Sequence, residues 1–72
     1  MENFTYRMYG KTELALLYCP YLSGSAARRK LLQWIRMQPR LLTDLQDLGF
    51  SKDTRNFTPV QVRLIVGALG EP

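Results

Sequence analysis

The residues with the clearest potential for chemistry are the basic side chains of residues 23–40, SGSAARRKLLQWIRMQPR. This run holds five of the chain's ten Lys and Arg residues and has no Asp or Glu. In a helix, which turns about 100° per residue, Arg29, Gln33 and Arg36 would lie on one face. Arginine can donate two hydrogen bonds to guanine, and glutamine can pair twice with adenine. This strip therefore has the residue types that read DNA in the major groove.

Further basic side chains could hold DNA phosphates around this strip. Some flank it in the same run, and two more lie in residues 50–57, a polar segment between two aromatic residues that could act as a wing. Contacts of this kind fix a protein on DNA without reading its sequence. The predicted nucleic-acid-binding residues are Arg28, Arg29, Lys30, Gln33, Arg36, Arg40, Lys52 and Arg55.

The basic run also has a purely structural explanation. Any amphipathic surface helix needs a polar face, and Arg and Lys are good helix formers that can fill it. Surface helices usually mix both signs of charge, because opposite charges four residues apart stabilise the helix. The absence of acids favours an anionic partner, so we expect a small non-enzymatic DNA-binding protein. The alternative is an adaptor that binds another protein, or itself, through the C-terminal helix or the basic helix.

Other chemistries lack the residues that they need. Gly10-Lys11-Thr12 resembles the end of a phosphate-binding loop, but Thr5 stands where that loop needs glycine, so we interpret Lys11-Thr12 as a turn and helix cap. Cys19 is the single cysteine and the chain has no His, which argues against an internal disulfide, a Cys/His zinc site and a Cys/His nucleophile. We expect no cofactor, no metal and no small-molecule substrate.

Length and charge limit the possible domain organisation and location of the protein. A chain of 72 residues is too short for two ordinary domains, so residues 1–72 are expected to form one. The formal net charge is +4, and the excess lies in residues 23–40. The start shows no signal-peptide pattern, and no stretch approaches the ~20 apolar residues of a membrane span. We therefore expect a cytoplasmic location and no membrane partner.

The basic strip must be positioned by elements that are mostly helices. Alternating apolar residues in 4–9 predict a short strand. Thr12 is the expected cap of a first short helix that Pro20 ends. The basic helix should run over residues 25–37, capped by Ser23 or Ser25. Its expected inner face consists of Ala27, Leu31, Trp34 and Ile35.

Two more helices complete the prediction. One should begin at Pro39 and end at Gly49, with an inner face of leucines and an outer face of acids. Residues 50–57 suit a hairpin or an extended loop that is anchored at both ends and could pair with the N-terminal strand, as in a winged helix. Thr58-Pro59 combines a helix cap with a first-turn proline, so the last helix should start there and be the most buried, or offer an apolar face. In the helix that begins at Pro39, the inner leucines are Leu41, Leu45 and Leu48, and the outer acids are Asp44 and Asp47.

The predicted fold class is therefore mainly α with minor β, a small four-helix domain of helix-turn-helix or winged-helix type with a short N-terminal strand. Residues 9–20, 26–35 and 57–72 resemble a family of uncharacterised small proteins from Bacteroides and its relatives, classed as a domain of unknown function. That resemblance implies a bacterial intracellular protein, often from mobile-element surroundings, and supplies no site residues. Residues 12–18, TELALLY, are also similar to the first helix of many helix-turn-helix regulators, although the link that follows is longer than theirs.

Overall fold

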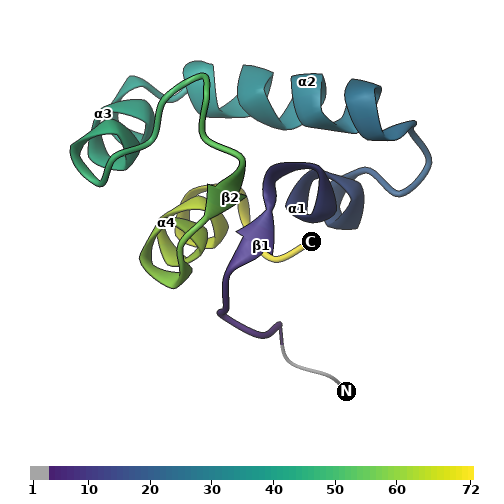
Figure 1. Ribbon diagram of the computed structural model, residues 1–72, viewed down its shortest axis with the longest axis horizontal. Helices are drawn as coiled ribbons and strands as arrows, with labels where there is room; N and C mark the ends of the chain where they lie inside the picture. Colours follow the sequence, from purple (N-terminus) through teal and green to yellow (C-terminus); the bar gives the residue numbers. More distant parts are fainter. Residues whose placement is uncertain (1–3) are drawn as a thin grey trace.

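The computed structural model describes residues 4–72, which form four helices and two short strands (Figure 1). This confirms the mainly helical fold class with a small amount of β structure. Figure 1 shows α2 along one edge of the molecule, with the other helices and the sheet to one side of it. The elements in chain order are β1 (Tyr9–Gly10), α1 (Lys11–Tyr18), α2 (Gly24–Arg36), α3 (Pro39–Asp47), β2 (Asn56–Phe57) and α4 (Pro59–Leu69).

Helix α2 forms much as its sequence predicts. Its N-cap is Ser23, whose Oγ accepts a hydrogen bond from the Ala26 N–H at 3.3 Å. The helix ends at Arg36 with Met37 as its C-cap, because Gln38, the residue directly before Pro39, is pushed out of the helical region. Three of the four predicted inner residues, Ala27, Leu31 and Ile35, are fully buried, and Trp34 is partly buried against the core.

The N-terminal strand is shorter than predicted, and the first helix starts earlier. Residues 4–8 lie outside any strand, because β2 offers only two residues to pair with. The predicted cap Thr12 is wrong, since α1 begins at Lys11 with Gly10 as its N-cap. Glu13 makes this start possible by accepting a hydrogen bond from the Gly10 N–H at 3.0 Å, which pairs that otherwise free donor.

Strands β1 and β2 pair antiparallel, with Tyr9 opposite Phe57. The Lys11 N–H adds one more bond of the same kind, to the Arg55 carbonyl oxygen at 2.8 Å. Residues 50–57 therefore do not fold back on themselves as a hairpin, and that alternative is wrong. The extended loop is correct, because its last two residues pair with the start of the chain instead.

Both ends of this loop are anchored in the core, as predicted. Phe50 is 8% exposed and Phe57 is fully buried, and their rings stack with centroids 5.7 Å apart. Between them, the Ser51 N–H donates to Thr54 Oγ1 at 2.9 Å, and the Thr54 N–H donates back to the Ser51 carbonyl oxygen at 3.1 Å. The two anchors and this turn hold residues 51–55 in one arrangement.

Helix α3 begins at Pro39 and buries Leu41 and Leu45, as predicted. Leu48 is 44% exposed, so its inward placement is wrong. The helix ends at Asp47, which leaves Leu48 at the C-cap, off the line of the inner face. The predicted terminating glycine, Gly49, stands one residue past this cap, with a φ of 94°, a conformation that glycine adopts without strain.

Helix α4 starts at Pro59 with Thr58 as its cap, as the sequence predicts. Thr58 Oγ1 accepts from the Gln61 N–H, and Gln61 Oε1 accepts from the Thr58 N–H at 2.9 Å. Gln61 is only 2% exposed, and its Nε2 also donates to the Leu48 carbonyl oxygen at 3.1 Å. This one side chain therefore fixes the start of α4 to the end of α3.

The core lies where the four helices and the small sheet meet. Its fully buried side chains come from α1, α2, α3, β2 and α4, and the largest are Phe57, Leu14, Leu31, Ile35, Leu45, Ile65 and Val62. Over residues 4–72, each helix is too short or too polar to cross a bilayer.

Candidate functional site

The predicted basic residues of α2 lie on three sides of the helix. Arg29 and Gln33 are exposed on its outer side. Arg28 and Arg36 lie on the flank that faces residues 50–55, where each lines a hollow. Lys30 lies on the other flank, with its Nζ 6.0 Å from the centre of the Trp34 ring. The predicted strip Arg29, Gln33 and Arg36 is exposed on α2, and Arg36 at its edge also borders the hollow beside residues 50–52.

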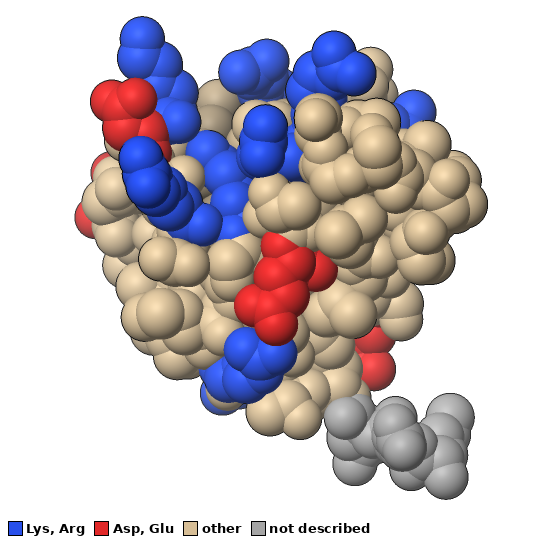
Figure 2. Space-filling view, turned by 45° about the vertical axis from the view of Figure 1, so that its right-hand side comes forward, with Lys and Arg blue, Asp and Glu red and all other residues tan. Residues whose placement is uncertain are grey.

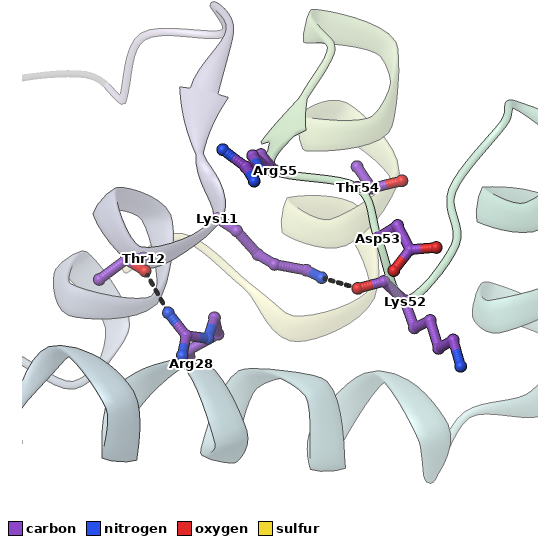
Figure 3. Close-up of a pocket in the computed structure, with 7 residues that line it drawn as sticks. All are labelled: Lys11, Thr12, Arg28, Lys52, Asp53, Thr54 and Arg55. Atoms are coloured by element: carbon purple, nitrogen blue, oxygen red, sulfur yellow. Dashed lines mark hydrogen bonds between the residues drawn. The ribbon is translucent and has the colours of Figure 1, made fainter.

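The most concentrated cluster of charge lines a hollow of about 690 Å³ between the start of α1, helix α2 and the segment before β2 (Figure 3). Four cationic side chains and one carboxylate contribute to its wall. Each comes from a position that the elements above hold in place. The lining residues are Lys11, Thr12, Arg28, Lys52, Asp53, Thr54 and Arg55.

Figure 3 shows how two cations enter this hollow from two different helices. Lys11 extends from the start of α1 toward the 52–55 segment, where its Nζ donates to the Lys52 carbonyl oxygen at 3.3 Å. Arg28 rises from α2, and its Nη1 donates to Thr12 Oγ1 at 3.0 Å. The Lys52 side chain points away from Lys11. Lys11 therefore crosses the hollow, and Arg28 lines the side nearest α2.

Lys11 is an unusual residue because it is only 7% exposed. Lysine is rarely buried to this extent without a carboxylate partner. Over residues 4–72 the structure contains a single ion pair, Arg7–Glu13 at 2.8 Å, so Lys11 is held by a carbonyl oxygen and by the Phe50 ring, 5.3 Å from its Nζ. Over residues 4–72, no carboxylate lies within ion-pair distance of the Lys11 ammonium group.

The surroundings of Lys11 act mainly against its charge. Burial lowers the pKa of its ammonium group, and the positive charges of Arg28 and Arg36 lower it further, whereas the carboxylate of Asp53 opposes them. A positive group whose neighbours disfavour its charge gains from a nearby anion. The local electrostatics thus favour a negatively charged ligand in the hollow.

The basic surface continues from this hollow along α2. Arg36 and Lys52 line a second, smaller hollow of about 200 Å³, and Lys52 belongs to both. Figure 2 shows Lys and Arg side chains gathered over the upper part of one face of the molecule, some of them recessed between others. We call the set Lys11, Arg28, Arg36, Lys52 and Arg55 the basic face.

Arg40 is a predicted site residue that does not belong to the basic face. It lines a separate hollow of about 300 Å³ between α3 and α4, together with Asp44 and Arg63. The structure therefore brings together four of the eight predicted residues, Arg28, Arg36, Lys52 and Arg55. It leaves Arg29 and Gln33 on the adjoining outer side of α2, and Lys30 and Arg40 elsewhere.

Sequence reasoning missed Lys11, which it assigned to a turn and cap. One signal was present in the sequence. A cation at the first position of a helix opposes the helix dipole, which favours negative charge there. Positions that break such a local rule are often functional. What the sequence did not contain was the neighbour, because Lys52 lies 41 residues away.

Of the two alternatives predicted for the C-terminal helix, burial rather than an apolar outer face describes most of its length, and Val60 near its start is 55% exposed. Val62 is fully buried and Val66 is 6% exposed, so neither is free to meet a partner. Leu69 is partly buried and lines a hollow of about 370 Å³ with Tyr18 and Trp34. An adaptor surface on this helix would have to use its end rather than its length.

Fold and site together define a small, mainly helical domain whose most concentrated surface feature is a cationic hollow. The family model described as Domain of unknown function (DUF4248) matches residues 5–72, so the chain belongs to this family. This confirms the resemblance to a domain of unknown function. Comparison with curated proteins and with solved structures gives no match. The functional argument therefore rests on the geometry of the site.

Proposed function

We propose that this chain is a small, non-enzymatic DNA-binding protein that holds duplex phosphates on the basic face. The observation that carries the proposal is the convergence of five cations from α1, α2 and the 52–55 segment. Over residues 4–72, none of the five forms an ion pair with an acidic side chain. Bringing like charges together destabilises a folded chain. A polyanion such as DNA offsets that repulsion on binding.

The shape of the molecule is compatible with helix-turn-helix docking. Helix α2 has 13 residues, hence a length of about 20 Å, and lies at one edge of the molecule (Figure 1). A helix of this size fits the major groove, which is about 12 Å wide. Arg29 and Gln33 on its outer side would then meet base edges, while Lys52 and Arg55 would reach phosphates beside the groove. A role as a transcriptional or mobile-element regulator follows from such binding.

Salt dependence and paired variants test this proposal. Fluorescence anisotropy with a pool of random duplexes should give a log Kd that changes steeply with log salt concentration, because each phosphate contact contributes about 0.9 to the slope. Arg36→Gln with Arg55→Gln should reduce the slope by about 2. The matched control is Arg40→Gln with Arg63→Gln, two equal charge losses beside a different hollow. No binding of any duplex at low salt would refute the proposal.

The alternative function is self-association or adaptor binding through the end of α4. It is favoured by one observation, the hollow in which Leu69 meets Tyr18 and Trp34. Sedimentation velocity over a range of concentrations distinguishes this alternative from DNA binding. A protein that associates through the end of α4 would dimerise or capture a partner through Trp34 and not through the basic face. Trp34→Ala should then abolish association and leave the salt-dependent binding of DNA intact.

A further inference from the structure

The hollow beside Lys11 differs from the rest of the basic face in size and in composition. We propose that it binds a phosphate monoester, the doubly charged group found in inorganic phosphate, in mononucleotides and at the phosphorylated end of a nucleic-acid strand. This inference does not depend on duplex binding, because it concerns one group in one hollow. It rests on charge, hydrogen-bond donors and shape.

The charge of the hollow matches a dianion better than a single charge. The hollow is lined by four cationic residues, Lys11, Arg28, Lys52 and Arg55, and by a single carboxylate, that of Asp53. A phosphate monoester has a charge of about −1.5 to −2 at neutral pH, whereas each diester of a nucleic-acid backbone has −1. The monoester therefore neutralises more of the excess positive charge within the same space.

The donors of the hollow are held in place before a ligand arrives. The Lys11 ammonium uses one of its three N–H groups on the Lys52 carbonyl oxygen, and the others remain for a ligand. Arg28 uses Nη1 on Thr12 Oγ1, so its guanidinium is fixed while its other donors stay available. Thr12 accepts that bond and keeps its own hydroxyl proton to donate. Fixed donors reduce the entropy lost when an anion binds.

The shape of the hollow favours a group that ends inside it. A monoester has one substituent and can terminate against Lys11, whereas a diester has two and must leave the hollow in two directions. The volume of about 690 Å³ lies within the range of small-ligand sites, which leaves room for a sugar and a base beside the phosphate. The hollow also adjoins the first turn of α1, where the helix dipole adds to the attraction.

The test begins with inorganic phosphate as the probe. Backbone amide chemical shifts of the full chain are followed during a phosphate titration, with chloride used to keep the ionic strength constant. We expect saturable shifts centred on Lys11, Thr12 and residues 52–55. Shifts that rise without saturation, or that are spread over all the basic residues, would overturn the proposal.

Two variants and a matched control locate the site. Arg28→Gln should weaken phosphate binding at least about tenfold, the effect of one charge-assisted hydrogen bond. Lys11→Met should do the same, and circular dichroism shows whether it folds. If it does not, Arg28→Gln alone still decides the outcome, because Arg28 is exposed. Arg40→Gln removes the same charge from an exposed side chain beside a different hollow and should leave phosphate binding unchanged. An equal loss in Arg40→Gln would refute a localised site.

A final comparison identifies the source of the monoester. An oligonucleotide with a 5′-phosphate is compared with the same strand ending in a 5′-hydroxyl, and a nucleoside 5′-monophosphate is used as competitor. Preference for the phosphorylated strand assigns the hollow to strand ends, and binding of the mononucleotide alone assigns it to a small ligand. Both results support the proposal, and failure of all three phosphates to bind overturns it. A 5′-hydroxyl duplex that does not bind would overturn only the proposal of duplex binding.

Discussion

At the scale of one residue, the charge of Lys11 destabilises the folded state. The residue is 7% exposed and lies beside Arg28, with no carboxylate within ion-pair distance over residues 4–72, and burial lowers the pKa of its ammonium group. Folding therefore places a charge where the protein disfavours it.

Replacement of Lys11 should make the free protein more stable. Below its lowered pKa, Lys11 is charged in both states and its burial destabilises the fold; as pH rises toward the ordinary value of 10.5, the folded state loses its proton first and stability increases. Lys11→Met should raise the free energy of unfolding by about 0.5–1 kcal/mol at neutral pH, the range of surface-charge optimisation. The difference should shrink as pH approaches 10.5.

Urea unfolding of both proteins at several pH values measures this difference. Lys52→Met is the control, since it removes the same charge from an exposed side chain. A Lys11→Met variant that is less stable than the parent at every pH would contradict the account of Lys11 as a disfavoured charge.

Tyr18 should give the opposite pH dependence. Its hydroxyl donates to the Gly70 carbonyl oxygen, and burial, followed by the nearby Tyr6 and Glu71, raises its pKa from 10.0 to about 12. The stability linked to this group is present below pH 10 and is lost as pH rises through about 12. Because the side chain is only partly buried, we expect a loss of about 1 kcal/mol, less than the full shift implies. Tyr18→Phe should remove this part of the decline in denaturant titrations across that range.

At the scale of elements, caps and prolines decide where the helices begin. Ser23, Pro39 and Thr58-Pro59 act locally, so their sequence signals predicted α2, α3 and α4 closely. The sequence indicated that residues 50–57 could pair with the N-terminal strand, which the structure confirms, but no local signal set the length or register of that pairing. Two residues per strand gain stability only when the chain has closed around them. Lys11 was not predicted as a site residue for a similar reason, because its neighbour Lys52 lies 41 residues away in the sequence.

The start of α4 offers a direct test of this local control. Thr58→Ala should remove one half of the reciprocal cap with Gln61 and lower the free energy of unfolding by about 1 kcal/mol. Ser25→Ala, an exposed hydroxyl in the first turn of α2 that is not its cap, should change stability by less than about 0.5 kcal/mol. Thermal and urea unfolding measure both, and equal effects of the two would argue against the cap.

At the scale of the whole molecule, the fold is as compact as a chain of this length can be expected to be. Its Cα radius of gyration is 11.3 Å, close to the value of about 11 Å for folded proteins of 72 residues. The hollow is thus a feature of a tightly packed fold rather than of loose packing. Filling it should add stability to the entire chain.

Phosphate should therefore raise the melting temperature. At ten times its Kd, a ligand that binds only the folded state stabilises it by about 1.4 kcal/mol, which corresponds to roughly 6–11 °C for a domain of this size. Differential scanning fluorimetry at constant ionic strength measures the shift. Arg28→Gln should abolish most of it and Arg40→Gln should preserve it. A similar rise with chloride alone would identify general salt stabilisation instead.

The pairing of β1 with β2 also has a consequence for folding kinetics. Lys11 and Lys52 are 41 residues apart, and the sheet that brings them together joins the first part of the chain to the last third. Non-local contacts of this kind are entropically costly and form late unless they belong to the folding nucleus. A ligand of the hollow would then leave the folding arm of a chevron plot in place and slow only the unfolding arm, so that it prolongs the lifetime of the native state without helping the chain to reach it.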